Sequence, residues 1–548
     1  MYSNDLHLNY LFLNVRFYLP KWLILSIFTI LVGGSFKYSN ELFEYSKNLE
    51  IFSSVYRTVQ EDYVEEVPPS KMAQTAITKM LESLDPYTVF FSEYQAEEAL
   101  IERQGEYGGV GCRVIKRNNF PMVTEIVPGY GFDKAGIKLG DYILATEDVS
   151  LHKKDMGEMM QYFRGAPNSQ FEITILRDND TLTKTITRAH VEQKSVSQSR
   201  LLKGNYGYIK LDEFGTACAA EIEHALRNQL DSYRINGLVL DLRNNGGGLL
   251  DQAVEIVGLF VPKNTSIVTL KGKHHEGPKN WKTPKEPLAL TLPLVVLINE
   301  RSASASEVVS GSLQDLDRAL IMGSNSFGKG LVQHYKNLPY RTQMKITTAR
   351  YHTPSGRCVQ RINYSLDQAI KTTQKRKPFK TKNGRLVYDG GGVDPDVDIK
   401  SSEEQQFIQW LEKNHVFFDY AQTQKNRWAG DKMNDAFALL SDFTKFAQRR
   451  TIKLTQKLFD RQVKENSDSI ITHQKSFFTI NEASINQWVS RHIKDYQESF
   501  LFKLRFHITE HLNDKVTAEK AMINDDPLIK MAKSKLNNPK EIKEILRH

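Results

Sequence analysis

Apolar strands that alternate with helical segments between Asn205 and about Lys400 constrain the fold of this chain more than any other feature. The strand-like runs are YGYIKL, GLVLDLR, LALTLPLVVLIN and RALIMG, and the helix-like segments between them include CAAEIEHALRNQL, LDQAVEIVGLF and SEVVSGSLQDL. The run GLVLDL shows no alternation of polar and apolar residues, as expected of a strand that is covered on both faces. We therefore predict an α/β core over residues 193–400.

The first 37 residues indicate export. The stretch Trp22–Phe36 carries no charge and follows Arg16 and Lys21, which is typical of a signal sequence. It is short for a relaxed membrane span, but no clear cleavage pattern follows it, so a removed signal and an uncleaved anchor are both open. A buried helix of a cytosolic protein is the third alternative. If the basic residues stay inside, the chain after Lys37 lies outside the cytoplasm, either periplasmic or membrane-anchored.

Three further regions differ from the α/β core in pattern. Residues 38–104 show mostly helical periodicity, which Asp85-Pro86 interrupts. Residues 105–192 contain short strands, turns and one helix near Lys154–Phe163, which predicts a compact β-rich module. Residues 401–548 have almost no glycine or proline and show helical periodicity. Capping the core, forming a homodimer and binding an adaptor are all open roles for these last helices.

Charge and cysteine content exclude other classes of protein. The net charge is +8 over 548 residues, and no basic stripe interleaved with aromatic residues is present. This pattern does not indicate a nucleic-acid partner. The three cysteines, Cys112, Cys218 and Cys358, are far apart and form no CxxC pair, which argues against both a disulfide framework and a cysteine zinc site.

The segment Asn299–Gln333 carries the most chemistry. It contains a turn of small residues with Ser302, Ser304 and Ser306, and then Lys329 between two glycines. A serine hydroxyl is a poor nucleophile unless a base removes its proton, and no histidine accompanies this turn. A lysine can be that base where burial lowers its pKa. The segment therefore predicts a nucleophilic serine that is activated by a lysine.

A second glycine-rich turn follows the strand that ends at Asp241. Gly246, Gly247 and Gly248 precede a helix, and amides at such a turn can face an anion or a developing oxyanion. A tight structural turn is the alternative reading of these three glycines.

Nucleotide binding is the competing interpretation of the lysine segment. Residues 323–329 fit G-x-x-x-x-G-K after a strand, but a P-loop requires Ser or Thr next, to hold Mg²⁺. Gly330 stands there and has no hydroxyl, and the acidic strand end at Asp241 comes before the loop rather than after it. Both departures disfavour a phosphate site.

The ordered motifs resemble those of the carboxyl-terminal processing, or tail-specific, serine proteases of peptidase family S41. The segment NERSASASEVVSGSLQDLDRALIMGSNSFGKGLVQ is similar to their catalytic segment, and SLDPYTVFF, DLRNNGGG, TARYHTPSGR and GGVDPDVDI match further landmarks in order. The resemblance runs from about Glu41 to Lys400. It implies a multidomain α/β fold: a ClpP/crotonase-like protease core, a β-rich PDZ domain, and helical N- and C-terminal regions. It also implies a serine endopeptidase that uses no metal and no cofactor.

The resemblance assigns roles to five positions. Ser304 is the nucleophile, Lys329 the general base and Gln333 the residue that orients the lysine. If this stretch is a strand, positions 329, 331 and 333 share one face, so the two side chains point together. The amides of Ala305 and Gly247 are the expected oxyanion donors.

The choice among the three serines and the role of Asp315 are not decided by the residue pattern alone. Ser302 and Ser306 fit the residue pattern as well as Ser304, and only the resemblance selects Ser304. Asp315 matches an acidic position of the family, for which we favour a structural role.

The β-rich module, residues 105–192, resembles a PDZ domain. Gly109, Val110, Gly111 and Cys112 match its carboxylate-binding loop, whose amides capture a free peptide C-terminus. Gly131-Phe132 stands where the family often has Pro-Ala. We expect protein or peptide substrates that are bound by their free C-terminus and cleaved near it. A catalytically inactive PDZ scaffold, and a PDZ fold that no longer binds tails, are the alternatives.

Overall fold

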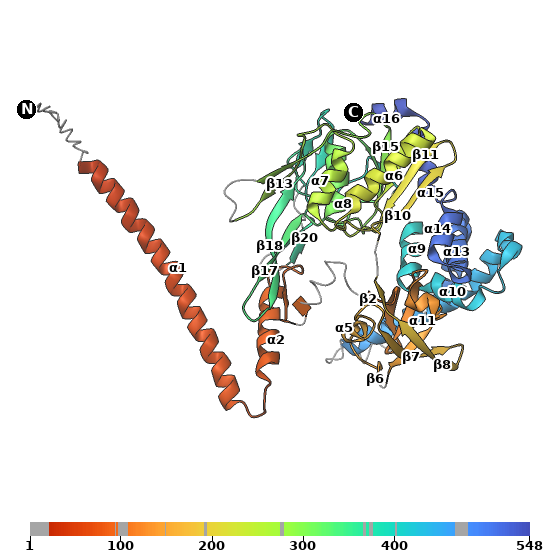
Figure 1. The fold of residues 1–548 in the computed structure, drawn as a ribbon, viewed down its shortest axis with the longest axis horizontal. Coiled ribbons are helices and arrows are strands. Elements are labelled where there is room, and N and C mark those ends of the chain that lie inside the picture. The colour runs from red at the N-terminus through yellow and green to blue at the C-terminus, as the bar shows by residue number, and fades with distance from the viewer. Residues whose placement is uncertain are drawn as a thin grey trace, which may run out of the picture. The chain divides into compact units, whose positions relative to one another are not determined.

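The computed structural model describes residues 21–93, 95–96, 108–147, 149–190, 194–273, 279–364, 369–371, 376–399, 403–465 and 481–547. Two compact units make up the chain, Met1–Met80 and Leu81–His548. The first contains α1 (Lys21–Asp62) and most of α2 (Pro69–Glu82), as drawn in Figure 1. The helical prediction is confirmed as far as Glu82. It is wrong at Val89–Phe91, which forms β1, because Pro86 stops the helix and the apolar residues that follow pair with another strand.

The predicted signal or anchor, Trp22–Phe36, lies at the start of α1, where the side chains are outside the described residues. Of the helices that the structure describes, none combines the length and the hydrophobicity that crossing a membrane requires.

A six-stranded sheet forms the centre of the second unit. In spatial order its strands are β10 (Val196–Leu202), β11 (Tyr206–Leu211), β12 (Leu238–Asp241), β15 (Leu294–Ile298), β16 (Leu320–Gly323) and β23 (Val397–Asp398). β10 is antiparallel to β11, and all the other neighbours are parallel. All four residues of β12 are buried, so the predicted α/β core with strands covered on both faces is confirmed.

Helices from distant parts of the sequence cover the two faces of this sheet. One face packs against α6 (Cys218–Tyr233), α7 (Leu250–Gly258) and α8 (Ala305–Asp315). The other packs against α15 (Pro527–Leu536) and α16 (Pro539–Ile545), which lie beside β11 and β15 in Figure 1. Successive residues of β12 point to opposite layers, because Leu238 and Leu240 join the first apolar cluster and Val239 joins the second.

A second sheet carries the lysine segment. Its strands are β1 (Val89–Phe91), β18 (Gln343–His352), β13 (Ser266–Lys271) and β14 (Lys279–Lys282), and β17 (Leu331–Asn337) also pairs with β18. Two short hairpins follow it, β19 (Ile362–Tyr364) with β20 (Ala369–Lys371), and β21 (Pro378–Lys380) with β22 (Leu386–Tyr388).

The β-rich module has its own apolar core. Its elements are β2 (Gly108–Gly109), β3 (Cys112–Arg117), β4 (Phe120–Ile126), α4 (Gly131–Lys134), β5 (Tyr142–Thr146), β6 (Val149–Ser150), α5 (Met156–Gln161), β7 (Gln170–Arg177), β8 (Asp180–Thr187) and β9 (Ala189–His190). Gly131 and Phe132 have physical reasons to differ from the family pattern. A Cβ at position 131 would lie 2.3 Å from the Thr187 carbonyl oxygen. The Phe132 ring is fully buried, 5.8 Å from that of Phe163.

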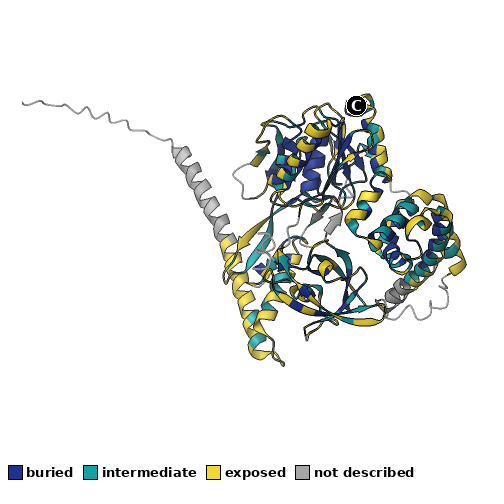
Figure 2. Cartoon of the chain, turned by 45° about the vertical axis from the view of Figure 1, so that its right-hand side comes forward, coloured by how far each residue is buried: buried dark blue, intermediate teal, exposed yellow. Residues whose placement is uncertain are grey.

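The C-terminal region is helical, as predicted. Its helices before the sheet-covering pair are α9 (Glu403–Lys413), α10 (Val416–Gln424), the 3₁₀ turn η1 (Gly430–Asn434), α11 (Ala436–Glu465), α12 (Glu482–Asp495), α13 (Gln497–Leu512) and α14 (Lys515–Met522). Helices α9 to α13 enclose an apolar core of their own, seen as dark blue residues inside the bundle in Figure 2. The sequence left capping of the core open as a role for this region, and α15 and α16 do cover one face of the central sheet.

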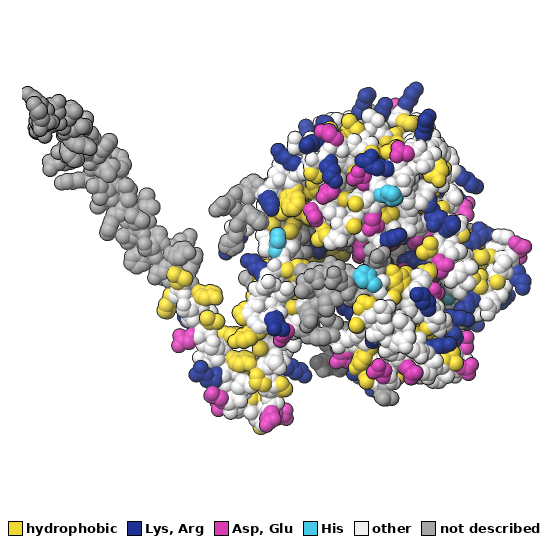
Figure 3. Space-filling view, in the orientation of Figure 1, with side chains coloured by type: hydrophobic (Ala, Val, Ile, Leu, Met, Phe, Trp, Pro, Cys, Tyr) yellow, Lys and Arg dark blue, Asp and Glu magenta, His cyan; other side chains and the backbone are white. Residues whose placement is uncertain are grey.

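Surface charge and cysteines agree with the sequence analysis. Lys and Arg side chains are scattered among acidic ones on the face shown in Figure 3 and do not gather into a stripe. Cys112, Cys218 and Cys358 are all free thiols, and burial raises the pKa of the Cys112 thiol to about 12.

Candidate active site

The serine turn exposes one of its three hydroxyl-bearing residues. Ser302 and Ser306 are each 0% exposed, and their hydroxyls donate to the carbonyl oxygens of Leu242 (2.8 Å) and Asn245 (2.9 Å). Ser304 is only partly buried, and it precedes α8 with φ 55° and ψ −112°. A residue with a side chain rarely adopts a positive φ, and such strain gathers at functional sites.

Glu307, in the first turn of α8, connects the serine turn to the lysine segment. Its Oε2 accepts hydrogen bonds from the amides of Ser304 and Lys329, each at 2.8 Å. Its Oε1 accepts from the Gly328 amide at 2.7 Å and from the Ser326 hydroxyl at 2.5 Å. The two backbones therefore lie within two hydrogen-bond lengths of each other, around one buried carboxylate.

The Glu307 carboxylate is electrostatically unusual. Burial raises its pKa to about 7, although the hydrogen bonds that it accepts oppose this rise. All four donors point at its oxygens, so only the ionised carboxylate satisfies them all.

Lys329 lies in a setting that favours the neutral amine. Burial and the positive charge of Lys345 lower its pKa, while Glu307 and Asp85 oppose the shift. The Lys329 Nζ lies 4.6 Å from the centre of the Tyr87 ring. The Ser304 hydroxyl and the Lys329 amine, both among the described atoms, are not hydrogen-bonded to each other. Catalytic contacts are often loose before substrate binds.

Tyr351 packs beneath both residues of the pair. Its hydroxyl lies 2.5 Å from the Lys329 carbonyl oxygen and 3.2 Å from the Ser304 carbonyl oxygen. Its ring is buried, so β18 supports the backbones of the serine and the lysine together.

Gln333 and Lys329, both among the described residues, are not hydrogen-bonded to each other. Its Nε2 donates to the Thr347 hydroxyl at 3.2 Å, and Thr347 in turn contacts Thr88, which donates to Asp85. Lys329 lies before β17, which begins at Leu331, so the argument that positions 329, 331 and 333 share one strand face applies only to Leu331 and Gln333.

The glycine turn lies against the serine turn. A Cβ at Gly247 would lie 2.8 Å from the Ser304 Cβ and 3.0 Å from the Ala305 nitrogen, and Gly247 has φ +101°. The Gly247 amide donates to the Asn245 Oδ1 at 2.9 Å. The Ala305 amide opens α8 and precedes its intrahelical hydrogen bonds.

Asn245 joins the two turns. It is fully buried, and its carbonyl oxygen accepts from the Ala303 amide (3.0 Å) and the Ser306 hydroxyl. Its side chain donates to the Leu211 carbonyl oxygen at 2.9 Å. One residue therefore sets the separation between the Gly247 backbone and the Ser304 backbone.

The competing phosphate-binding interpretation fails on the same geometry. A P-loop directs its backbone amides at a phosphate, but here the amides of Gly328 and Lys329 donate to Glu307. A Cβ at Gly330 would lie 2.9 Å from the Gln360 nitrogen, so the position has no space for the Ser or Thr that Mg²⁺ would require.

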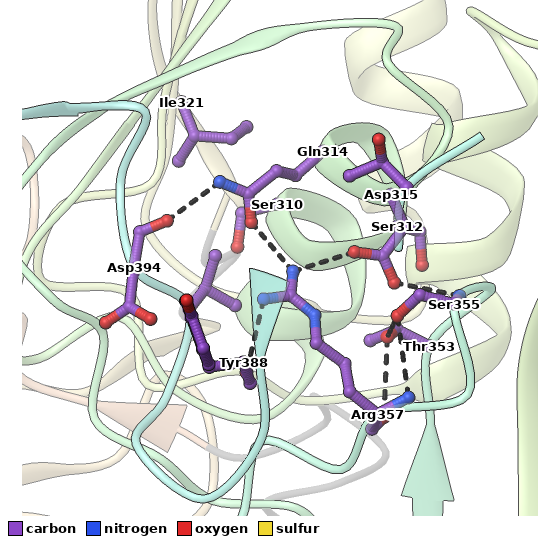
Figure 4. A network of polar contacts seen from close by, with 12 residues as sticks. Ser310, Ser312, Gln314, Asp315, Ile321, Thr353, Ser355, Arg357, Tyr388 and Asp394 are labelled. Atoms are coloured by element: carbon purple, nitrogen blue, oxygen red, sulfur yellow. Dashed lines mark hydrogen bonds and ion pairs between the residues drawn. The ribbon is translucent and has the colours of Figure 1, made fainter. Parts of the chain in front are cut away.

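Asp315 lies away from the pair, at the C-terminal end of α8. It forms an ion pair with Arg357 at 2.8 Å, and both side chains are fully buried. Arg357 also donates to Gln314 (2.7 Å), as Figure 4 shows, and the Asp315 carboxylate accepts from the Ser355 amide (3.0 Å). These contacts join α8 to the segment after β18, which is a structural role.

The predicted carboxylate-binding loop of the β-rich module is tightly packed. Gly109 ends β2 and Cys112 begins β3. The carbonyl oxygens of Val110 and Gly111 accept from the amides of Phe132 (3.0 Å) and Val127 (2.8 Å). Gly111 has φ +71°, and a Cβ there would lie 2.3 Å from the Tyr130 Cβ.

Sequence reasoning missed four residues of this site: Glu307, Asn245, Tyr87 and Tyr351. Glu307 had a local signal, since Ser304-x-x-Glu307 before an apolar run is the pattern of a capping box. The other three reach the site through strand pairing and turn packing over long sequence distances, which no local pattern indicates.

Comparison with known proteins gives two family matches. The model of peptidase family S41 matches residues 205–370, and the PDZ domain model matches residues 108–187. A carboxy-terminal-processing protease of Bartonella bacilliformis is 32% identical over 352 residues, which cover 63% of this chain and 80% of the relative. A probable CtpA-like serine protease of Staphylococcus aureus is 30% identical, over 76% of this chain and 88% of the relative. The solved photosystem II D1 C-terminal processing protease is 27% identical, over 64% of this chain and 92% of that chain, with a TM-score of 0.38.

Proposed function

This chain belongs to the carboxy-terminal-processing serine proteases of peptidase family S41, and from that premise we propose that Ser304 is its nucleophile and Lys329 its general base. The observation that carries the proposal is the shared carboxylate: one oxygen of Glu307 accepts the amides of both residues at 2.8 Å. The choice of Ser304 is supported because the hydroxyls of Ser302 and Ser306 are buried and bonded to backbone carbonyls.

The reaction follows from the placement of these groups. The Ser304 hydroxyl attacks the peptide carbonyl carbon while the neutral Lys329 amine takes its proton. The lysine then gives this proton to the departing amine as the peptide bond breaks, and water hydrolyses the resulting ester. Gln333 orients Lys329 only if substrate binding changes its present contact with Thr347.

The Ala305 amide is the better placed of the two proposed oxyanion donors, because it is the first amide of α8. The Gly247 amide donates to the Asn245 side chain in this structure. It can therefore stabilise an oxyanion only by sharing or exchanging that hydrogen bond.

Proteolysis of an unfolded protein by the purified chain tests the proposal. The expected result is cleavage by the wild type and by Ser324→Ala, and none by Ser304→Ala. Ser324 is a suitable control because, among the described residues, its hydroxyl hydrogen-bonds only to Glu300, at 3.3 Å. Cleavage by Ser304→Ala would contradict the proposed nucleophile, and absence of cleavage by the wild type would favour an inactive PDZ scaffold.

We also propose that the PDZ domain binds the free C-terminus of the substrate through Gly109–Cys112. The proposal is supported by the PDZ match over residues 108–187 and by the way such loops capture a carboxylate with successive amides. Amidation of a substrate's C-terminus should raise the KM for cleavage of that substrate. Equal cleavage of the amidated and the free tail would refute this part of the proposal.

Export of the chain remains a further proposal, which the uncharged Trp22–Phe36 behind two basic residues supports. Cell fractionation of the full-length protein tests it, and mass spectrometry of its N-terminus separates a cleaved signal from a retained anchor. Recovery of the intact chain in the cytoplasmic fraction would refute it.

A further inference from the structure

Arg243 lies between two carboxylates, one two residues before it and one in the distant C-terminal helical region. Its Nη2 is 2.6 Å from Oδ2 of Asp241, at the end of β12, and 2.9 Å from Oδ2 of Asp526, in the C-terminal helical region. Asp241 is 1% exposed and also accepts from the Tyr208 hydroxyl at 2.9 Å. Burial disfavours the Asp241 carboxylate, but the Arg243 guanidinium still holds its pKa below the usual value.

This arginine stands where the strand becomes the glycine turn. Its own amide donates to the Asp241 Oδ1 at 3.0 Å, which bends the chain out of β12. The next residue, Asn244, exchanges two hydrogen bonds with Asn299, which directly follows β15 and precedes the serine turn. A displacement of Arg243 would therefore move the start of the turn that carries Gly247 relative to Ser304.

Asp526 makes two separable contacts. Its Oδ1 caps α15 by accepting from the amides of Leu528 (2.8 Å) and Ile529 (3.1 Å). Its Oδ2 meets Arg243. The cap needs only an oxygen acceptor, which an asparagine also supplies, whereas the contact with the guanidinium draws on the negative charge.

The helix before Asp526, α14, is held at its start and its middle by two ion pairs. In α14, Lys515 pairs with Glu125 of β4 in the PDZ domain at 2.9 Å, and Glu519 pairs with Lys210 of β11 at 2.7 Å. The segment before Asp526 is therefore bound to both the PDZ domain and the central sheet. These ion pairs constrain the position of the Asp526 carboxylate that contacts Arg243.

We propose that Asp526 is a positioning residue of the proteolytic site. It holds Arg243 against Asp241, so that the turn leaving β12 keeps the Gly247 backbone opposite Ser304. The proposal rests on the proposed Ser304–Lys329 chemistry. It goes beyond the family assignment because the peptidase model matches only residues 205–370, so the C-terminal region supplies a part of the site that this match does not include.

Substitutions at Asp526 in the full-length protein separate positioning from capping. Removal of the whole region is not a suitable test, because α15 and α16 cover one face of the sheet. Asp526→Asn keeps a good cap and loses the charge, while Asp526→Glu keeps the charge and is a poorer cap. Asp525→Asn is the matched control, since Asp525 is exposed and its one ion pair within the described part of the chain is with the exposed Lys530, at 3.4 Å.

The expected order of kcat is wild type, then Asp526→Glu, then Asp526→Asn, with the asparagine variant about ten-fold or more below the wild type. KM and the melting temperature of Asp526→Asn should stay close to those of Asp525→Asn. If Asp526 acted only as a helix cap, the kcat of Asp526→Asn would exceed that of Asp526→Glu. This result, equal kcat values, or any other departure from the expected order would overturn the inference. Ser304→Ala is assayed in parallel. If it is active, the proposed chemistry fails; if it is inactive, the order at position 526 decides this inference alone.

Discussion

Lys329 can accept a proton only as a neutral amine, and its surroundings act on that equilibrium in opposite directions. Burial and Lys345 lower its pKa, and the carboxylates of Glu307 and Asp85 raise it. The face of the Tyr87 ring, 4.6 Å from Nζ, also favours the cation. The net direction is downward, so the fraction of neutral amine at neutral pH is larger than for a solvated lysine.

The charge of Lys345 gives a test of this balance. Replacement by glutamine removes a cation that disfavours the Lys329 ammonium, so the pKa of Lys329 rises. Because the base must be deprotonated, the acidic limb of the kcat/KM profile should move to higher pH in Lys345→Gln. Lys336→Gln, on the exposed end of β17, serves as the control. An acidic limb that stays in place, or moves to lower pH, would argue against Lys329 as the titrating base.

At the scale of elements, the N-terminus of α8 organises the site through a single carboxylate. Glu307 satisfies amides on two segments that are more than twenty residues apart in sequence. The first amides of a helix have no intrahelical acceptor and are normally satisfied by capping groups. Here the cap also holds the lysine segment, so one buried carboxylate, whose pKa burial raises to about 7, binds both segments.

Glu307→Gln should destabilise the fold as well as the site. The glutamine NH₂ replaces one of the two carboxylate oxygens that accept hydrogen bonds from four donors. The buried donors that met this oxygen lose their acceptor, which lowers the free energy of unfolding by about 2 kcal/mol or more. Urea denaturation measures this loss. Glu300→Gln, an exposed carboxylate near the same turn, should change the stability little. Equal stability of the two variants would show that the four contacts of Glu307 contribute little.

The glycine turn offers a second test at this scale, with a control one residue away. Gly247→Ala places a Cβ 2.7 Å from the Ala303 carbonyl oxygen, at φ +101°. Strain of this kind costs about 1–3 kcal/mol, and we expect most of the kcat to be lost. Gly246→Ala has no atom within 4 Å of its new Cβ and should behave as the wild type. Activity of Gly247→Ala at the level of Gly246→Ala would contradict the close packing of the two turns.

At the scale of the whole molecule, the C-terminal helices connect parts that the sequence presents as separate. Asp419 of α10 accepts from Arg117 at the end of β3 through both oxygens, at 2.5 and 2.6 Å, and from Arg450 of α11 at 2.5 Å. Lys515 meets Glu125 on the neighbouring strand. These charge-assisted contacts hold the β3–β4 hairpin of the PDZ domain against the helical bundle.

Asp419→Asn should release this hairpin. The change removes the charge that two guanidinium groups share, so amides of residues 112–126 should exchange hydrogen faster, as measured by mass spectrometry. Asp431→Asn, on the exposed η1 turn, is the control. Unchanged exchange in the hairpin would mean that the Lys515–Glu125 pair and packing suffice to hold it.

Much of this architecture could be predicted from the sequence, and the limits have physical causes. The strand runs GLVL, before Asp241, and LPLVVLI are apolar because both faces are covered, so the α/β core followed from their composition. The helical periodicity of residues 401–548 did not show which surface Ile529 and Leu536 of α15 cover, because periodicity carries no information about a partner distant in sequence.

The same limit applied to the site. A serine of the turn and Lys329 stood out as a chemical pair, and only the family resemblance selected Ser304. The start of β17 at Leu331, beyond Lys329, is set by pairing with β18 and was not indicated by the sequence. Asn245 and Tyr351 act through contacts between turns and strands, which only the folded chain reveals.

Covalent trapping of the nucleophile tests the central claim most directly. The full-length protein is treated with a peptidyl fluorophosphonate, and the modified residue is located by tandem mass spectrometry. We predict a single adduct on Ser304 and none in Lys329→Arg, because an arginine does not give up its proton near neutral pH. An adduct on Ser302 or Ser306, or full labelling of Ser304 in Lys329→Arg, would contradict the Ser304–Lys329 mechanism.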